Sequence, residues 1–419
     1  MKKIWEFPWG YAEGFMVAAG VVLAGVLLQF ASGNIDPVLF AYPVNGIVGG
    51  LFVAALLIVH FSAGRSRMAR WLAGIYATIP ALVVFLVLVA ILGLVPQWSV
   101  DRGAEQMPAQ FFSLLGWHRV TTSWPFVLLC FHILSIVGLA TLKRTTQKQG
   151  WRDIGFYLNH LGLFIALLGG LLGSADMERM TMRVQEGQVE WRGADRTGEV
   201  QELPLALQLD TFMMEEYEPK LVLIDNETGK MLPASRPESY MFEGVGKTTT
   251  LAGVLVEVTD WLPHAAIFRD SSFVNVVPMK MEGAASAVKV KASKPGMGQP
   301  VEGWVTCGSY LFPPLFLQVD RETSIAMPVQ EVKKYSSHVT AFTKGGTTKE
   351  AVIEVNRPLK VEDWMVYQYS YDDSKGKYSD TSVFELVRDP WLKVVYAGIF
   401  MLLAGALFLF MAGPKKKTT

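Results

Sequence analysis

The amino-acid sequence predicts a membrane protein with six transmembrane helices and a large, mainly antiparallel β domain between the fifth and sixth helices. The 419 residues are 51% hydrophobic and 18% charged, with a mean hydropathy of +0.29, which is too apolar for an ordinary soluble enzyme of this length. The long apolar blocks lie before residue 175 and after residue 390. Between them, short runs alternate apolar and polar residues, as β-strands do.

Six segments are long and apolar enough to cross a bilayer, which takes roughly 20 mainly apolar residues. They are residues 10–30, 44–61, 71–95, 123–142, 154–172 and 391–411. The first has no small-residue cleavage site after a short apolar core, which favours a retained helix over a signal peptide. Tryptophans near several segment ends are typical of membrane interfaces.

Basic residues predict how these helices are oriented. With six crossings, four basic clusters fall on one side of the membrane, and the short loop 31–43 on the other side has no lysine or arginine. The clusters are Lys2 and Lys3; Arg65, Arg67 and Arg70; Lys143, Arg144, Lys148 and Arg152; and Lys415, Lys416 and Lys417. Because basic loops tend to stay in the cytoplasm, both termini are predicted to be cytoplasmic. Residues 96–122 and 174–390 then face outward, which in a Gram-negative cell is the periplasm.

The chain is therefore predicted to have five regions. They are the first three helices (1–95), a periplasmic loop (96–122), helices four and five (123–173), a periplasmic β-rich domain (174–390), and the last helix with a basic cytoplasmic tail (391–419). Period-two patterns rich in β-branched and aromatic residues predict strands in the β-rich domain. These strands are residues 203–209, 220–224, 251–258, 287–292, 310–318, 351–355, 364–371 and 382–387.

Several function classes find no support in the sequence. The 38 basic and 38 acidic residues balance, so nothing indicates a nucleic-acid partner. The two cysteines, Cys130 in an apolar block and Cys307 in the β-rich domain, form no Cys-x-x-Cys, which excludes covalent c-type haem attachment to this chain. No Gly-rich phosphate loop, His-Glu-x-x-His or Gly-x-Ser-x-Gly is present. The chain is therefore not expected to be catalytic alone.

His160 is the first candidate for a functional side chain, because an imidazole inside a membrane helix is costly and commonly functional. It is expected about 9 Å inside the cytoplasmic edge of the fifth helix. One face of that helix is small, with Gly162, Ala166, Gly169 and Gly173, and should pack closely on another helix. His160 lies opposite, with the apolar residues Phe156, Phe164, Leu167 and Leu171. Such a setting suits either an axial haem ligand or a histidine that hydrogen-bonds a neighbouring helix.

Two further histidines are weaker candidates. His132 lies near the middle of the fourth helix, about 15 Å from its cytoplasmic end. It could be a second haem ligand, a proton-relay group or a structural hydrogen-bonding residue. His118 lies in the outer loop, and it is either a residue that contacts haem at the outer surface or an ordinary interfacial polar residue.

An ordered series of short motifs runs from the fifth predicted helix to the last one. The series begins with His160-Leu-Gly-Leu-Phe-Ile-Ala-Leu-Leu-Gly-Gly and Met182-Arg183-Val184-Gln185-Glu186-Gly187, and continues with Leu203-Pro204-Leu205, Leu209-Asp210-Thr211-Phe212, Glu216-Tyr217 and Pro219. It ends with Asn356-Arg357-Pro358-Leu359, Tyr367-Gln368-Tyr369-Ser370-Tyr371-Asp372 and Asp389-Pro390 before the last helix. Together the motifs cover about residues 120–412, and in this order they resemble the ResB (CcsB) family of system II cytochrome c biogenesis proteins. Thr211 is a departure, because the family has Asp and Phe adjacent.

The resemblance implies a function. ResB proteins partner CcsA, whose tryptophan-rich WWD segment binds haem, and the pair presents haem outside the bacterial inner membrane for attachment to the Cys-x-x-Cys-His thiols of apocytochrome c. The family's membrane histidine matches His160, which implies that this residue ligates a transient haem b. No WWD-like segment is present, so a separate polypeptide must supply the attaching half. The first two helices, residues 10–61, exceed the usual four of the family.

Two other functions remain open at this level. A b-type membrane cytochrome would hold haem between His132 and His160 for quinol-linked electron transfer, since their depths differ by only about 6 Å, which helix tilt could absorb. A non-catalytic scaffold would dock apocytochrome on the β-rich domain and would not need His160. The ordered motifs of that domain favour the haem-handling function, because a cytochrome b has no use for them.

Overall fold

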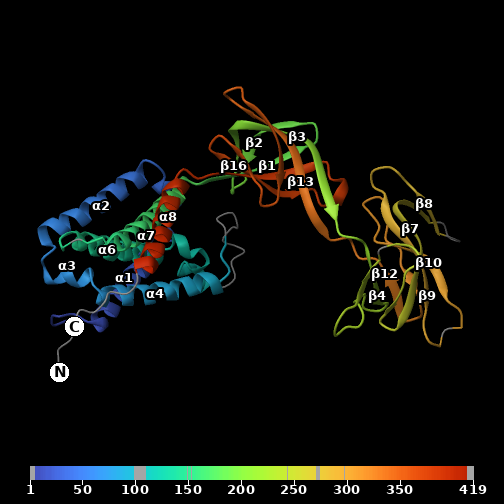
Figure 1. Ribbon diagram of the computed structural model, residues 1–419, viewed down its shortest axis with the longest axis horizontal. Helices are drawn as coiled ribbons and strands as arrows, with labels where there is room; N and C mark the ends of the chain where they lie inside the picture. Colours follow the sequence, from blue (N-terminus) through green and yellow to red (C-terminus); the bar gives the residue numbers. More distant parts are fainter. Residues whose placement is uncertain are drawn as a thin grey trace. The chain divides into compact units, whose positions relative to one another are not determined.

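The computed structural model describes residues 5–98, 110–148, 150–151, 153–242, 244–269, 274–296 and 298–412. The chain divides into two compact units (Figure 1). The helical unit comprises Met1–Arg179, Arg196–Gly198 and Val387–Thr419, and the β unit comprises Met180–Asp195 and Glu199–Leu386.

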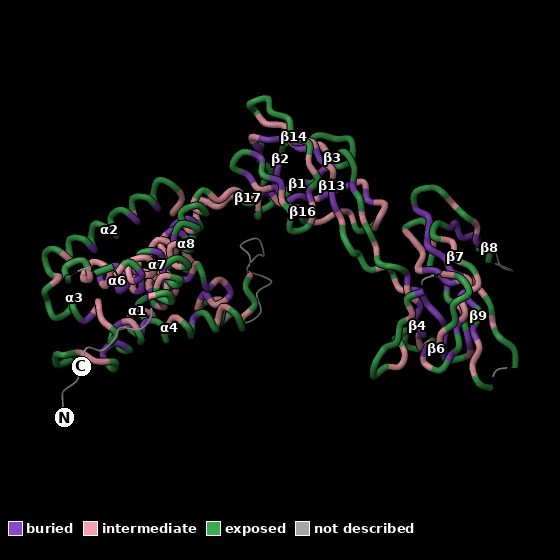
Figure 2. The backbone as a smooth tube through the Cα atoms, viewed as in Figure 1, coloured by how far each residue is buried: buried purple, intermediate pink, exposed green. Residues whose placement is uncertain are grey.

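Six helices among the described residues are long and apolar enough to span a membrane, and they confirm the six predicted segments. They are α1 (Tyr11–Ser32), α2 (Val44–Ala63), α4 (Ile75–Leu94), α6 (Trp124–Thr145), α7 (Asp153–Gly173) and α8 (Leu392–Ala412). Shorter helices are η1 (Pro37–Phe40), α3 (Arg67–Leu72), α5 (Gln110–Leu114), η3 (Trp117–Thr122) and η4 (Ser174–Asp176). Much of the length of the long helices is exposed (Figure 2). Large apolar side chains, including Leu51, Leu86 and Phe410, are among the exposed ones, as expected of surfaces that contact lipid.

The third predicted segment differs from the structure at its start. Trp71 does not begin the spanning helix but belongs to the short helix α3, which Ser66 caps through a hydrogen bond from the Ala69 backbone N–H to its Oγ (3.1 Å). The chain then becomes extended at Gly74 (φ −127°, ψ 168°), and α4 begins at Ile75. The sequence did not predict this break, because residues 71–95 are apolar throughout and composition does not specify backbone angles.

Glycines bring α7 and α8 into direct backbone contact. A Cβ built at Gly162 would lie 2.7 Å from the carbonyl oxygen of Gly398, and one built at Gly398 would lie 2.6 Å from the backbone nitrogen of Ala166. Real Cβ atoms essentially never approach backbone this closely, so the contact requires glycine at both positions. The predicted small-residue face of the fifth helix therefore packs on the last helix.

Polar side chains fasten the other helices at their ends. Gln29 of α1 is buried; its Nε2 donates to Asn34 Oδ1 (2.8 Å), and its Oε1 accepts from the Trp124 backbone N–H (3.2 Å) at the start of α6. At the opposite end of α6, Lys143 donates to the carbonyl oxygen of Arg70 (3.4 Å). Two of the predicted basic clusters therefore lie at one end of the helical unit.

The β unit holds three mainly antiparallel sheets among its described residues. Their strand orders are β14-β13-β3-β2-β1-β17-β16-β15, then β10-β9-β7-β6 with β8 on β7, and β11-β12-β4-β5. The strands are β1 (Glu178–Gln185), β2 (Val189–Ala194), β3 (Val200–Glu216), β4 (Lys220–Asp225), β5 (Ser239–Met241), β6 (Thr248–Leu251), β7 (Val254–Arg269), β8 (Val274–Pro278), β9 (Ala285–Ser293), β10 (Val301–Thr306), β11 (Leu317–Gln318), β12 (Thr323–Ala326), β13 (Val332–Thr343), β14 (Thr348–Glu354), β15 (Leu359–Val361), β16 (Trp364–Tyr371) and β17 (Thr381–Arg388).

Alternating apolar residues build the cores of these sheets. Leu203, Leu205, Leu207 and Leu209 of β3 point to one face and are all at least 95% buried. They form one core cluster with Phe384 of β17. A second cluster lies around Val256, Val288 and Phe242 in the other two sheets.

Two predicted strands differ from the observed ones. Residues 251–258 form a hairpin rather than one strand, because Ala252 (φ 47°) and Gly253 (φ 84°) both adopt positive φ and turn the chain between β6 and β7. Within residues 310–318, only Leu317–Gln318 forms a strand. Pro313 and Pro314 lack backbone N–H donors for a sheet ladder, so the apolar pattern there does not produce pairing.

The α7–α8 contact predicts opposite results for two glycines of one helix. Gly162→Ala should destabilise the protein by about 1–3 kcal/mol, because the methyl group overpacks a backbone contact. Gly170→Ala should be neutral or slightly stabilising, because a Cβ there meets nothing within 4 Å. Thermal unfolding in detergent measures both, and an equal loss in the two variants would contradict the close-contact interpretation.

Acid should weaken the β unit through Asp320. The Lys294 ammonium (Nζ–Oδ2 3.0 Å), followed by bonds from Thr323 and Glu322, lowers the pKa of Asp320 to about 2. Because unfolded aspartate titrates near pH 4, this stabilisation is complete above about pH 4 and is lost as the pH falls towards about 2. Hydrogen exchange of β-unit peptides in the whole protein should show a weaker acid dependence for Asp320→Asn than for the wild type. The control Glu227→Gln, whose carboxylate makes no hydrogen bond among the described residues, should keep the wild-type dependence.

Candidate functional site

His160 lies in α7, two turns after the helix begins at Asp153, and its side chain is half-buried. The imidazole stacks on the ring of Phe156, one turn earlier, with centroids 3.8 Å apart and planes 24° apart. Its Nδ1 lies 3.0 Å from the carbonyl oxygen of Phe156. The ring is therefore held on one side by an aromatic face and at one nitrogen by the helix backbone.

This contact assigns the tautomer of the neutral imidazole. A carbonyl oxygen only accepts hydrogen bonds, so Nδ1 must carry the proton that it donates to Phe156. Nε2 then carries the free lone pair. A metal-binding histidine commonly has this arrangement, in which one ring nitrogen donates to a backbone carbonyl and the other faces the metal.

An ion pair links α6 to the start of α7 beside this histidine. Arg144, near the end of α6, donates through Nε to Asp153 Oδ1 (3.1 Å), and its Nη2 contacts the same oxygen. Asp153 also accepts from the Gly150 backbone N–H (2.7 Å) in the first turn of α7, where a carboxylate is favoured by the helix dipole. The Arg144 guanidinium lies 6.0 Å from the ring centroid of Phe156. The pair therefore joins the α6–α7 turn to the ring on which His160 stacks.

The structure does not join the other two candidate histidines to His160. His132 is half-buried in α6, and among the described residues no hydrogen bond or ring contact links it to His160. His118 is only 4% exposed in η3, with Nδ1 3.0 Å from the carbonyl oxygen of Pro96 and the rings of Trp98 and Phe112 edge-to-face beside it. His118 thus helps to hold the loop between α4 and α6. No group of three or more His, Cys, Asp or Glu suited to a metal occurs in the part of the chain that the structure describes.

Asp176 forms a polar centre that the sequence did not reveal. It follows α7 and accepts three hydrogen bonds: from the Tyr42 backbone N–H (2.6 Å), from Asn45 Nδ2 (2.7 Å) and from Trp391 Nε1 (2.6 Å). Asn45, at the start of α2, is fully buried and also donates to the Leu172 carbonyl oxygen (3.2 Å). One carboxylate therefore ties α2, α7 and the residue before α8 together. The sequence carries only two signals for this site: an aspartate just after one apolar segment and an asparagine inside another.

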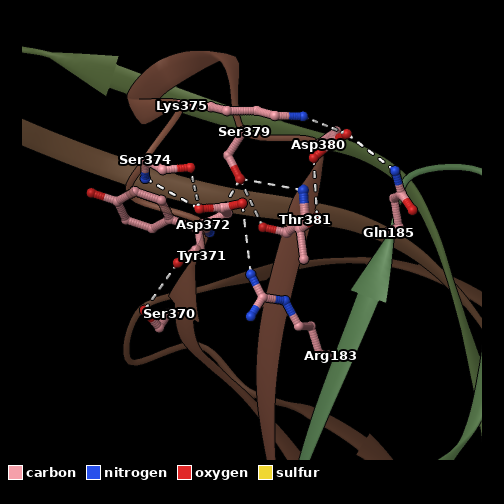
Figure 3. Close-up of polar contacts among 10 residues, drawn as sticks. All are labelled: Arg183, Gln185, Ser370, Tyr371, Asp372, Ser374, Lys375, Ser379, Asp380 and Thr381. Carbon is pink, nitrogen blue, oxygen red and sulfur yellow. Dashed lines mark hydrogen bonds and ion pairs between the residues drawn. The ribbon is translucent and has the colours of Figure 1, made fainter. Parts of the chain in front are cut away.

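The C-terminal family-like motif, residues 367–372, occupies the end of β16, and its last residue, Asp372, begins the connection to β17 (Figure 3). Asp372 Oδ1 accepts from the Ser374 backbone N–H (3.1 Å) and hydroxyl (2.7 Å), and these bonds lower the pKa of Asp372. Arg183 of β1 lies 3.7 Å from the other carboxylate oxygen. Gln185 of the same strand donates to Asp380 Oδ2 (3.2 Å), as does Lys375 (2.9 Å). Asp372 of the motif and Asp380 before β17 therefore both tie this connection to β1.

These features define a polytopic membrane protein with six spanning helices and an antiparallel β unit inserted between the last two. The family model of the ResB-like family matches residues 138–240 and 286–381. The chain belongs to this family, and its general role is in cytochrome c biogenesis. No curated protein matches the chain. The matched residues include His160, Asp176 and Asp372. Helices α1, α2 and α4, the part of α6 before residue 138, and with them His118 and His132, lie outside the match.

Loss of the Asp176 carboxylate should destabilise the protein more than loss of a carboxylate that accepts a single exposed hydrogen bond. Asp176→Ala should cost about 2–4 kcal/mol, because three donors, including the buried Asn45 amide, lose a charged acceptor. The control Asp36→Ala, which removes one exposed hydrogen bond to Val38 in η1, should cost about 1 kcal/mol or less. Thermal unfolding measures both, and equal losses would mean that the three contacts do not act as one fastening.

Proposed function

We propose that this protein is the haem-handling subunit of a system II cytochrome c synthase, and that His160 is the membrane ligand of its haem cargo. The observation that carries the proposal is the geometry of His160. Its Nδ1–H is engaged by the Phe156 carbonyl oxygen, which leaves Nε2 with the lone pair that a haem iron requires. His160 also lies within the residues that match the family.

The chain's own groups would act on haem in three ways. His160 Nε2 would donate its lone pair to the iron as an axial ligand. The Phe156 ring and carbonyl oxygen would hold the imidazole in one rotamer and one tautomer. The Arg144–Asp153 pair would keep the α6–α7 turn fixed, so that binding of the cargo does not have to order it. Haem b would be bound transiently and passed on.

The partners proposed are a CcsA-like protein with a WWD segment and the apocytochrome c that receives haem. Since no WWD-like segment occurs in this chain, attachment would be performed by the partner. The bacterial inner membrane is the proposed location, with both termini cytoplasmic and the β unit periplasmic. The contact between Lys143 and Arg70 supports this orientation, because it brings two basic clusters to one end of the helical unit.

Haem content tests the proposal. His160→Gly, co-expressed with a CcsA-like partner, should retain less than about a tenth of the wild-type haem by pyridine haemochrome, because the axial bond is lost. Added imidazole should restore part of that haem, which a purely structural defect would not allow. The matched control, His132→Gly in α6, should retain haem.

Two outcomes would replace the proposal. Stoichiometric haem in the protein expressed alone, dependent on both His132 and His160, would identify an electron-transfer cytochrome b. Unchanged haem and unchanged cytochrome c maturation in His160→Gly would leave a scaffold that docks apocytochrome without ligating haem.

A further inference from the structure

A cavity of about 550 Å³ lies in the helical unit; His160 does not line it, and its lining residues lie outside those that match the family. Its wall comes from the segment before α1, from α3 and from the start of α4. The lining residues are Phe7, Pro8, Trp9, Arg67, Arg70, Trp71 and Tyr76. Neither the proposed haem ligand nor the Asp176 centre uses any of them.

Aromatic rings form the apolar wall of this cavity. Phe7 stacks on Trp9 with centroids 4.6 Å apart, and Trp9 meets Trp71 edge-to-face at 5.1 Å. Trp71 is only 8% exposed, yet its Nε1 has no hydrogen-bond acceptor among the described residues. A buried donor without an acceptor is costly and unusual in a purely structural position. The wall therefore combines a large apolar surface with an unpaired polar group.

Two uncompensated positive charges stand on the same wall. Arg67 and Arg70 are three residues apart on α3, a spacing that places side chains on neighbouring positions of one helix face. Both are exposed, and no carboxylate of the described residues forms an ion pair with either guanidinium. Guanidinium groups bind phosphate through paired hydrogen bonds. The cavity therefore favours an anion attached to an apolar group.

The position of the cavity indicates what kind of anion that is. It lies where α1 and α4 begin, beside the end of α2, and therefore at one face of the spanning-helix bundle. Tryptophan and tyrosine at such helix ends lie at the depth of lipid headgroups. Basic pockets between spanning helices bind the headgroups of anionic lipids.

We propose that this cavity binds one anionic phospholipid, with its phosphate on Arg67 and Arg70 and its glycerol and upper acyl chains against Trp9 and Trp71. The site belongs to the N-terminal helices and does not depend on the haem-handling function. It gives these helices a role of their own, as the part of the protein that holds a specific lipid at the bundle edge.

Native mass spectrometry of the delipidated full-length protein tests the proposal. Dioleoyl phosphatidylglycerol should bind the wild type at one site more tightly than dioleoyl phosphatidylcholine. The double variant Arg67→Gln with Arg70→Gln should weaken phosphatidylglycerol binding roughly thirtyfold and leave phosphatidylcholine binding unchanged. Arg65→Gln is the matched control, because Arg65 is exposed just before α3 but does not line the cavity, and it should bind like the wild type.

Other outcomes would overturn the proposal. Equal weakening in Arg65→Gln would mean that general charge, not the cavity, attracts the lipid. Displacement of the lipid by glycerol 3-phosphate would assign the site to a free phosphate, and displacement by protoporphyrin IX would assign it to an aromatic dicarboxylate. Unchanged phosphatidylglycerol binding in the double variant, with thermal unfolding like that of the wild type, would remove the site.

Discussion

The backbone contact between α7 and α8 is the constraint on which the arrangement of the helical unit depends. The β unit is inserted between these two helices, so the chain must leave the helical unit at the end of α7 and return at the start of α8. Glycines at 162 and 398 let the two helices touch along their length, and Glu178 and Arg388 close the two connecting strands with an ion pair (2.8 Å). The departing and returning segments are therefore held side by side. Asp176 and Trp391 reinforce the same point with a hydrogen bond.

The same contact determines which face of α7 is left uncovered by α8. Because α8 covers the glycine face, His160 lies on a different face of α7, where its ring stacks on Phe156. The bond to Phe156 is made within α7 and does not need a neighbouring helix. The orientation of the imidazole is therefore set within α7 itself.

The sequence predicted those features that repeat along the chain. Apolar length indicated the six helices, and the spacing of Gly162, Gly169 and Gly173 indicated a close-packed face, because both signals follow the period of one element. It did not predict the break at Gly74 or the hairpin at Ala252 and Gly253, since these depend on backbone angles at single residues. The Asp176 centre was missed for another reason. Its donors come from Tyr42, Asn45 and Trp391, and no local pattern relates residues so far apart in the chain. The position of His160 relative to the glycine face could be predicted, but its bonded nitrogen could not, because a sequence does not specify a rotamer.

The N-terminal helices are integrated with the family-matched part rather than appended to it. Asp176 lies within the matched residues, yet all three of its hydrogen-bond donors lie outside them: Tyr42 and Asn45 near the start of α2, and Trp391 just before α8. Leu172 of α7 likewise lies against Gly49 of α2, where a Cβ would come within 2.8 Å of its side chain. A charged group at the end of a spanning helix needs partners that a lipid chain cannot supply. In this protein Tyr42, Asn45 and Trp391 supply them, so the C-terminal end of α7 depends on residues outside the family match.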